Sequence, residues 1–398
     1  MRIGIFGNTN NYPLALAMGL RKLGHQAVLV VNRKEPLHRP ESKYAEFAQR
    51  YPDWLLDCSD IPEDDFVAGS PRIGDVINFL SVHSDGLILN DLGPSLLGYC
   101  QQPAVALMTG SDISYYADYR TLETRRQCWS SEYTRSPGGR LATQRWGEFI
   151  GRQREGLLAA QAVSCPFPGL VPEIDDLLRA IGVSDARRIF VYLTGAVDRS
   201  ALLKEGAQKL RILNGARLNW KKPMPAGFSR QDHKGTDILL RGFAQFLQAG
   251  GQGEIVLFRK GLHVEETEGL TRELGIFKDI IWKGELGLNE FYAELEQADI
   301  VCDQFGDSFP GLVALDAMAL GRPVIANFRP PIMSAHYPEP IPAFQAECAE
   351  DVKHHLLKLS ASRDLRRSAG LAGRRFAETY LSPEANAIKC LKAMGLER

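Results

Sequence analysis

A chain of 398 residues is long for a single hydrophobic core, so two domains of roughly 150–200 residues are expected. The formal net charge of −1 excludes a global attraction for nucleic acid, and the hydrophobic content of 44% is ordinary for a soluble globular protein. The seven cysteines are scattered without a Cys-x-x-Cys pair, which favours reduced thiols over a disulfide framework or a zinc site. Since no apolar run approaches the length of a membrane span, and the N-terminus lacks the apolar core of a signal peptide, we expect a cytoplasmic protein.

Short apolar runs alternate with helical periodicity along the whole chain, which is the pattern of βα units around a parallel sheet. A helix over 13–23 follows the first strand. The first half predicts strands at 2–6, 27–31, 76–80, 86–89, 104–108 and 162–165.

A second series of βα units begins near residue 188. It predicts strands at 189–193, 210–214, 254–258, 279–282, 299–303 and 323–327. Helices are expected between them at 236–248, 264–274, 289–297 and 309–320, and from about residue 350 three helices follow without a strand. The two doubly wound halves join around 194–209. Because open parallel sheets bind ligands beyond the carboxyl ends of their strands, two facing sheets would form a cleft.

Residues 299–326 are the most informative segment. They predict a buried strand, a loop ending in Pro310-Gly311, an amphipathic helix and a second strand after Gly-Arg-Pro. The loop leaves unpaired backbone N–H groups at the helix start, where an anion is favoured. Asp316 is expected about two turns into the helix, on the face shared with its start. N–H groups for phosphates and a carboxylate for ribose hydroxyls suit a nucleotide; a solvated helix acid and an ordinary turn are the alternative.

This segment resembles the C-terminal domain of the GT-B glycosyltransferases, particularly family 4, which shows Glu, seven residues, Glu, then Ala-Met and Gly-x-Pro-Val-Ile-Ala. The resemblance implies the α/β GT-B fold, with two Rossmann-like doubly wound domains facing across a cleft. An acceptor-binding domain over 1–200 would be joined by a helix over 382–398 that crosses back from the donor-binding domain over 201–381.

The same resemblance assigns the donor site. Asp316 corresponds to the second acid of the pattern and would bind the ribose. The first acid falls on Ser308, with Asp307 one residue earlier, so either Asp307 takes that role or the function is weakened. The other implied donor-binding residues are Phe309, Pro310, Gly311 and Leu312.

Two cations are expected at the same edge of the second sheet. Arg217 follows the strand at 210–214, and Lys234 precedes Gly235 at a helix start. Family 4 enzymes place an Arg and a Lys in this way, so the resemblance implies that both stabilise the departing nucleoside diphosphate as it gains negative charge. It also implies no metal and no cofactor. Surface cations on loops are the alternative.

Two polar turns in the first half are candidate sugar-binding segments. Relatives often have a His at the position of Thr109, in the turn that ends at Asp112, although capping of the next helix explains this turn equally well. Asn10 and Asn11 lie in the loop before Pro13, where many relatives contact the donor phosphate or the acceptor; an ordinary polar turn is the alternative. The loop lacks Gly-x-Gly-x-x-Gly, which argues against a dinucleotide dehydrogenase.

Residues Arg120 to Arg154 contain eight Arg, no Lys and three acids, interleaved with Trp129, Tyr133, Trp146 and Phe149. Arg beside aromatic residues suits a phosphate- or carboxylate-bearing acceptor, or peripheral contact with an anionic membrane surface. The alternative is a solvated pair of helices around a turn at 136–139.

The resemblance implies a cytoplasmic or membrane-peripheral enzyme of bacterial polysaccharide or glycoconjugate synthesis. It would move a sugar, with retention, from a nucleotide-diphosphate sugar to a hydroxyl of a glycan, a lipid-linked or a small-molecule acceptor. A nucleic-acid partner is not expected. Two alternatives stay open: a nucleotide-sugar epimerase of the same fold, and a catalytically weak scaffold that binds sugar or nucleotide, which the residues Ser308 and Thr109 favour.

Overall fold

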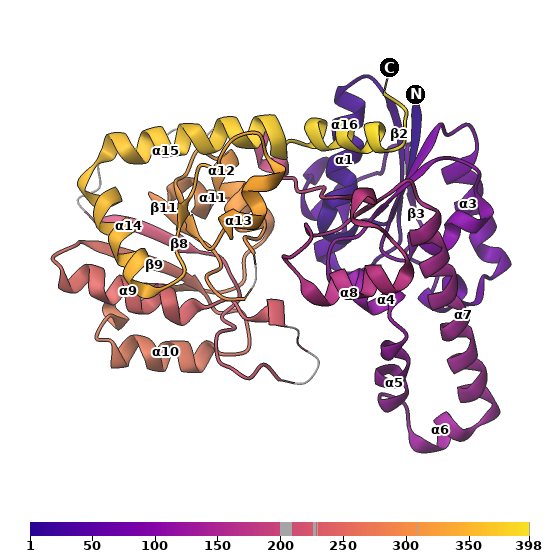
Figure 1. The fold of residues 1–398 in the computed structure, drawn as a ribbon, viewed down its shortest axis with the longest axis horizontal. Helices are drawn as coiled ribbons and strands as arrows, with labels where there is room; N and C mark the ends of the chain where they lie inside the picture. Colours follow the sequence, from indigo (N-terminus) through magenta and orange to yellow (C-terminus); the bar gives the residue numbers. More distant parts are fainter. Residues whose placement is uncertain (200–208, 226–227, 229, 308, 398) are drawn as a thin grey trace. The chain divides into compact units, whose positions relative to one another are not determined.

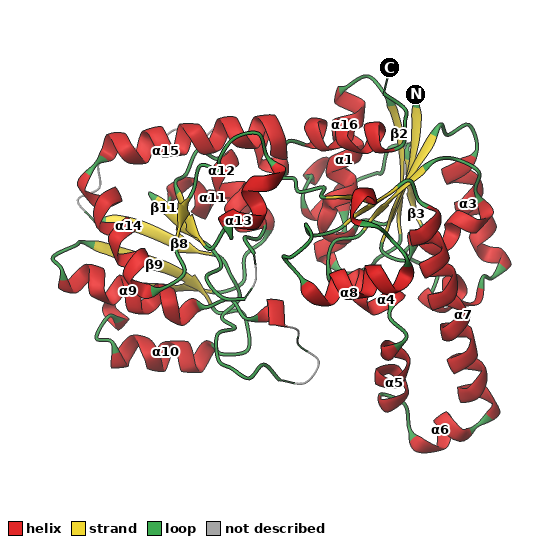
Figure 2. Ribbon diagram, viewed as in Figure 1, coloured by secondary structure: helices red, strands yellow, loops and turns green. Residues whose placement is uncertain are grey.

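The computed structural model describes residues 1–199, 209–225, 228, 230–307 and 309–397, so that Ser308 lies outside the described residues. The chain divides into two compact units, one made of Met1–Tyr192 with Pro383–Arg398 and the other of Leu193–Ser382. Both are α/β units with helices packed around a parallel sheet (Figures 1 and 2). Among the described residues, none of the helices combines the length and the apolar character needed to cross a membrane.

The first unit is built on a seven-stranded sheet in the order β3-β2-β1-β4-β5-β6-β7, in which every pair is parallel. The order reverses between β1 and β4, so this sheet has its topological switch point there. The strands are β1 (Arg2–Phe6), β2 (Gln26–Val31), β3 (Leu55–Asp57), β4 (Gly86–Asn90), β5 (Ala104–Leu107), β6 (Ala162–Ser164) and β7 (Arg188–Ile189).

The helices of the first unit cover its sheet and include the last helix of the chain. That helix packs on α1, and the approach is close: a Cβ on Gly19 would lie 2.6 Å from the carbonyl carbon of Pro383. The α-helices are α1 (Tyr12–Lys22), α2 (Glu63–Ala68), α3 (Gly74–Ser81), α4 (Ser111–Ala117), α5 (Arg120–Gln127), α6 (Ser131–Arg135), α7 (Pro137–Ala159), α8 (Pro172–Ile181) and α16 (Pro383–Ala393).

The second unit has a six-stranded parallel sheet in the order β10-β9-β8-β11-β12-β13. Its strands are β8 (Leu210–Asn214), β9 (Gly253–Phe258), β10 (Ile280–Lys283), β11 (Ile300–Cys302), β12 (Val324–Ala326) and β13 (Phe344–Gln345). Its α-helices are α9 (Thr236–Gln248), α10 (Val264–Glu273), α11 (Leu288–Gln297), α12 (Leu312–Ala319), α13 (Pro330–Met333), α14 (Ala349–Ala361) and α15 (Arg363–Phe376), the last continuing into a π-helical turn over Ala377–Leu381.

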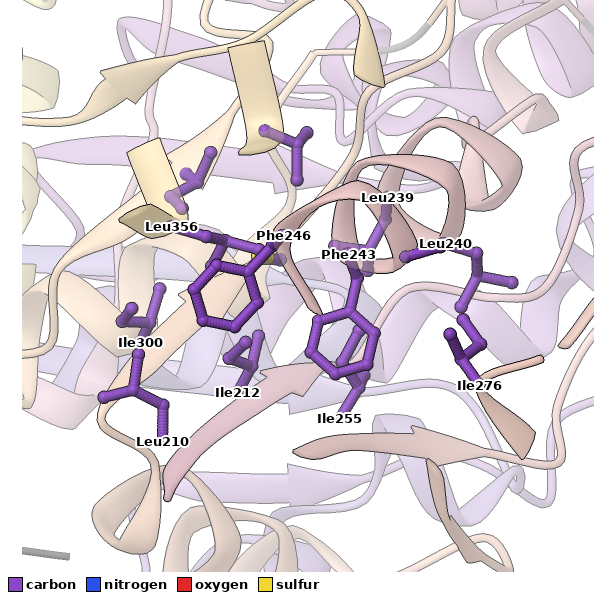
Figure 3. Close-up of a cluster of buried hydrophobic side chains, with 14 of the residues drawn as sticks. Leu210, Ile212, Leu239, Leu240, Phe243, Phe246, Ile255, Ile276, Ile300 and Leu356 are labelled. Atoms are coloured by element: carbon purple, nitrogen blue, oxygen red, sulfur yellow. The ribbon is translucent and has the colours of Figure 1, made fainter. Parts of the chain in front are cut away.

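A hydrophobic core holds α9 against this sheet (Figure 3). Phe243 and Phe246 of α9 are fully buried, with ring centroids 6.0 Å apart, and belong to one cluster with Ile212 and Ile255 of the strands. The helix presents these side chains because they recur at spacings of three and four residues. This packing fixes the start of α9, which follows the predicted cation Lys234.

Most expected elements are confirmed with small shifts at their ends, including the three helices without a strand after residue 350. The strand expected at 189–193 as the start of the second series was wrong in its length and its place: β7 covers only Arg188–Ile189 and pairs with β6 in the first sheet, so the second sheet begins with β8. The strand expected at 76–80 was wrong: these residues lie in α3, where Val76 and Leu80 are buried four residues apart. The sequence analysis missed β3 and β13, short strands of three and two residues. The helix expected from residue 309 begins at Leu312, since Gly311 has an extended backbone.

Candidate functional site

The carboxyl ends of β8 and β11 lie side by side, and the loops that follow the two strands contact each other closely. The Asn214 side chain, at the end of β8, donates to the backbone oxygens of Cys302 (3.2 Å) and Asp303 (3.0 Å). Gly235 has φ 68°, and a Cβ there would lie 2.6 Å from the Gly306 nitrogen. A glycine after Lys234 is therefore required both by the left-handed backbone and by the close approach of the next loop.

Lys234 is held beside this edge by hydrogen bonds to Gln231 and Gln304. Its ammonium group donates to the backbone oxygen of Gln231 (2.7 Å) and to Oε1 of Gln304 (2.9 Å). Burial lowers the pKa of Lys234 and the positive charge of Arg217 lowers it further, while Asp303 opposes both. The structure thus brings the two predicted cations into electrostatic contact, with Arg217 exposed and Lys234 partly buried.

Asp303, which the sequence analysis did not select, follows β11, and its side chain reaches the start of α12. The side chain is only 1% exposed, and its Oδ2 accepts from the backbone N–H of Gly311 at 2.6 Å. Its Oδ1 has no hydrogen-bond partner among the described residues. Burial raises the pKa of Asp303 to about 6, against the lowering effect of the Gly311 N–H and of Lys234. The prediction of unpaired N–H groups at this helix start was therefore wrong for Gly311.

Asp316 is the fifth residue of α12, little more than one turn into the helix rather than two. It is 7% exposed and accepts a hydrogen bond from the hydroxyl of Thr194. The Thr194 hydroxyl oxygen in turn accepts from the backbone N–H of Ala196 (2.9 Å), which starts the 3-10 turn Gly195–Asp198. One carboxylate oxygen of the predicted ribose-binding residue is thus fixed by a residue far away in the sequence.

Asp307 lies among cations supplied by the long loop before α9. It forms ion pairs with Lys222 (2.7 Å) and Arg230 (3.6 Å), and Nδ1 of His233 lies 3.7 Å from its carboxylate. Burial favours a higher pKa for Asp307, but these cations, Lys222 first, hold it below its ordinary value. The remaining predicted donor-binding residues line the approach to α12: Phe309 is half-buried, Pro310 is buried, and Gly311 and Leu312 are half-buried.

The two predicted asparagines of the first unit differ in their environments. Asn11 is buried, and its amide group donates to the backbone oxygens of Leu37 and Arg39 and to the Ser42 hydroxyl, each at 3.2 Å. Asn10 is exposed, and both residues have positive φ. Asn11 therefore anchors the following loop, while Asn10 keeps an accessible amide.

The turn from Thr109 to Asp112 is fastened internally. The Asp112 carboxylate accepts from the backbone N–H groups of Thr109, Gly110 and Ile113, all at 2.9 Å, and from the Thr109 hydroxyl at 3.0 Å. Burial raises the pKa of Asp112 to about 6 despite these donors. The N-cap of α4 is Gly110 and Asp112 lies inside the helix, so its carboxylate fastens the turn from the first helical turn instead of occupying the cap position.

A buried ion-pair network near the switch point was also missed by the sequence analysis. Arg33, which follows β2, donates to both oxygens of Asp91, which follows β4, at 2.9 and 2.7 Å. The Tyr116 hydroxyl accepts from Arg33 (2.7 Å) and donates to Glu63 (2.5 Å). Asp91 has φ 62°, uncommon for a residue other than glycine. The available signal was an Asp directly after a strand, at the edge where open sheets bind ligands.

Two α/β units, each with a doubly wound parallel sheet, define the GT-B fold class. No family model and no curated protein sequence matches the chain. The chain is similar in structure to sucrose-phosphate synthase from Thermosynechococcus elongatus, with 14% identity and a TM-score of 0.55 over 98% of this chain and 97% of that one. It is also similar to HepE from Anabaena in complex with UDP and glucose, with 13% identity and a TM-score of 0.59 over 99% of both chains.

A third similar structure, from Listeria monocytogenes, is assigned as a UDP-N-acetylglucosamine 2-epimerase, with 14% identity and a TM-score of 0.52 over 99% of this chain and 95% of that one. Such low identities show a shared fold, and they do not separate transferases from epimerases.

Proposed function

We propose that the protein is a glycosyltransferase that moves a sugar from a nucleotide-diphosphate sugar to an acceptor hydroxyl. The observation that carries this proposal is the convergence of Arg217, Lys234 and Asp316 with the start of α12 in the second unit of a GT-B fold. The fold similarity adds support, because the HepE structure holds UDP and glucose.

The proposed chemistry is breakage of the bond between the anomeric carbon and the diphosphate oxygen, with formation of a new bond to the acceptor oxygen. The diphosphate leaves with the bonding electrons and takes up the proton that the acceptor hydroxyl gives up. Arg217 and Lys234 would stabilise the departing diphosphate more than the bound donor, which is the condition for catalysis. Asp316 would accept hydrogen bonds from the ribose hydroxyls, with the Thr194 hydroxyl orienting its carboxylate.

The finer parts of the proposal concern stereochemistry, metal and destination. We infer retention at the anomeric carbon and turnover without a divalent metal, since two cations are available for neutralisation. The acceptor would be a glycan, a lipid-linked or a small-molecule hydroxyl in bacterial polysaccharide or glycoconjugate synthesis, with the enzyme in the cytoplasm or at its membrane. Turnover that persists in excess chelator supports the metal-independent mechanism, and loss of turnover contradicts it.

An epimerase is the second candidate, because one of the similar structures is assigned to that class. An epimerase converts the sugar of the nucleotide without any acceptor, whereas a transferase releases nucleoside diphosphate. Incubating the protein with a nucleotide sugar alone distinguishes them by the product. A protein that binds the nucleotide and forms neither product supports the scaffold alternative.

The experiment that tests the proposed site is a thermal-shift panel of UDP, GDP, ADP, dTDP and CMP with wild type, Asp316→Ala and Thr194→Val. A nucleotide at about 100 times its dissociation constant adds roughly 2.7 kcal/mol of apparent stability. Thr194→Val removes the hydrogen bond to Asp316 but keeps the carboxylate, so it controls for lost structure. We expect one diphosphate to stabilise wild type and Thr194→Val but not Asp316→Ala. If Asp316→Ala binds like wild type, the ribose assignment is wrong.

A further inference from the structure

A helical arm extends from the body of the first unit (Figure 1). It consists of α5, α6 and the first part of α7. The second part of α7 belongs to the core of the unit: Phe149 and Ile150 are fully buried, and a Cβ on Gly156 would lie 1.9 Å from the Pro94 oxygen. The first part of α7 packs on α5 and α6 instead.

The arm is a tightly built structure. Ser130 and Ser136 cap α6 and α7 by accepting from the backbone N–H groups of Tyr133 (3.1 Å) and Gly139 (3.0 Å). Between α5 and α7, the Arg125 guanidinium lies 3.4 Å from the centroid of the Trp146 ring. A Cβ on Gly139 would lie 2.0 Å from the Tyr133 oxygen, which fixes α6 closely against α7. The arm therefore holds its tip in a defined position.

The tip combines apolar and cationic side chains at the surface. Tyr133 is 44% exposed and Leu141 is 46% exposed, and Trp129 packs edge-on against Tyr133 with ring centroids 5.5 Å apart. Arg135 and Arg140 flank them and are exposed. Large exposed apolar side chains gathered beside cations mark an interaction surface rather than an ordinary solvated helix pair.

The charge of the arm determines which partner fits it. Residues 120–146 contain six Arg and two Glu, a formal charge of +4 in a chain whose net charge is −1. Arg120 and Arg126 are paired with Asp118 and Glu123. By contrast, among the described residues no carboxylate forms an ion pair with Arg135, Arg140 or Arg145, and all three side chains are exposed. The Arg140 guanidinium donates one hydrogen bond to the backbone oxygen of Arg135 (2.6 Å), and a guanidinium group has five N–H donors, so these side chains can still bind phosphate.

We propose that the tip of the arm, formed by Trp129, Tyr133, Leu141 and the arginines at 135, 140 and 145, binds an anionic lipid surface. Tyr and Trp rings are amphipathic and settle at the level of lipid headgroups, Leu141 adds apolar area, and Arg binds the phosphates. A tip that presents these side chains outward fits a broad layer of headgroups. This proposal does not depend on the proposed enzymatic activity, because it concerns where the protein lies rather than what it transfers.

The test is sedimentation of the full-length protein with vesicles of equal parts phosphatidylglycerol and phosphatidylcholine, against vesicles of phosphatidylcholine alone. We expect binding to the anionic vesicles only, and less of it at high salt. Replacing all three tip arginines by Gln should reduce partitioning about 100-fold, since each cation near the surface contributes about fivefold. The matched control replaces Arg363, Arg367 and Arg375 of α15 by Gln, because these are exposed and carry the same charge.

Two further variants test the apolar contribution and the source of the phosphate. Tyr133→Ser with Leu141→Ser should weaken binding while leaving every charge in place. Trp129→Phe should abolish a blue shift of tryptophan fluorescence on vesicle binding, because Trp129 is at the tip. Inorganic phosphate should compete no better than sodium chloride of equal ionic strength.

Several results would overturn the proposal. These are absent binding to anionic vesicles, equal loss in the α15 control, an undiminished affinity in the Tyr133 and Leu141 variant, or displacement by phosphate alone. The thermal midpoints of the variants, measured in parallel, distinguish lost binding from lost folding.

Discussion

Asp303→Asn is the most informative perturbation of the second unit, because it changes one charge at the start of α12 and little else. The Asn side chain keeps the shape of Asp303 and an oxygen that can accept the Gly311 N–H, which lies 2.6 Å from the present carboxylate. The substitution removes a buried negative charge beside Lys234, where we propose that a diphosphate binds. Stability and nucleotide binding should therefore both change, and both changes should depend on pH.

The magnitude follows from the raised pKa. The pKa of Asp303 rises from an ordinary 3.8 to about 6 because of burial. The folded protein therefore binds more protons than the unfolded chain between these values, so this carboxyl contributes stability below pH 3.8 that is lost as the pH rises through about 6. A difference of about two pH units corresponds to about 3 kcal/mol. Asn is uncharged throughout, so Asp303→Asn should gain about 3 kcal/mol over wild type between pH 4 and pH 7.

Urea unfolding of both proteins across this pH range measures the difference between their free energies of unfolding. Other groups whose pKa is raised into this range, such as Asp112, contribute equally to both proteins and cancel in the difference. Calorimetric titration with the diphosphate that stabilises wild type should show tighter binding by Asp303→Asn at pH 8, with the two proteins converging below pH 6. Asp299→Asn, at the other end of β11, is the matched control and should leave binding unchanged. A stability gap independent of pH, or weaker nucleotide binding by Asp303→Asn at pH 8, would refute the reasoning.

Other substitutions test the cation, the core and the close approaches between helices. Lys234→Met should weaken diphosphate binding about 10- to 100-fold in calorimetry, because a charged hydrogen bond contributes roughly 1.5–3 kcal/mol. Lys209→Met is the control and should leave binding unchanged, since Lys209 is an exposed cation paired with Glu254 and Asp279. Phe246→Ala should lower the free energy of unfolding by about 3–5 kcal/mol in urea, and a loss below 1 kcal/mol would mean that the site collapses without a cavity. Gly370→Ala should lower the free energy of unfolding by about 1–3 kcal/mol, since its Cβ would lie 2.0 Å from the backbone oxygen of Gly321. Gly269→Ala in α10 should raise it by up to about 1 kcal/mol, because a Cβ there meets nothing within 4 Å. Thermal midpoints of the two variants that move in the same direction would contradict this pair of predictions.

The fold was predictable from the sequence because the signals for α9 and β8 are local. The spacing of Phe243 and Phe246 and the apolar run at 210–214 lead to the elements that the structure contains. The error at 76–80 has the same origin: a short apolar run fits a strand or a buried helix turn, and only packing decides between them. The two-residue strand β13 pairs through its backbone alone and leaves no periodic pattern.

The candidate site was predictable only where a motif marked it. Asp316 and Lys234 stand in recognisable strings, whereas Thr194 reaches Asp316 from 122 residues away, and no local pattern encodes that contact. Asp303 was overlooked because it ends an apolar strand and was assigned to the strand itself. Its burial and its bond to Gly311 depend on the fold of the loop, which comes from tertiary structure.

The cations at the edge of the second sheet have different hydrogen-bond and ion-pair partners, and this difference bears on catalysis. Lys222 and Arg230 share the single carboxylate of Asp307, so one negative charge already offsets part of their positive charge before any ligand arrives. Lys234 donates to the backbone oxygen of Gln231 and to Oε1 of Gln304, and a phosphate oxygen can take the place of these acceptors. Such a cation is oriented in advance and gains most when the diphosphate acquires negative charge, because the gain requires no reorganisation at that moment. The nearby carboxylate of Asp303 opposes anion binding in the ground state, so the site is expected to favour the departing diphosphate over the intact donor only if Lys234 outweighs it.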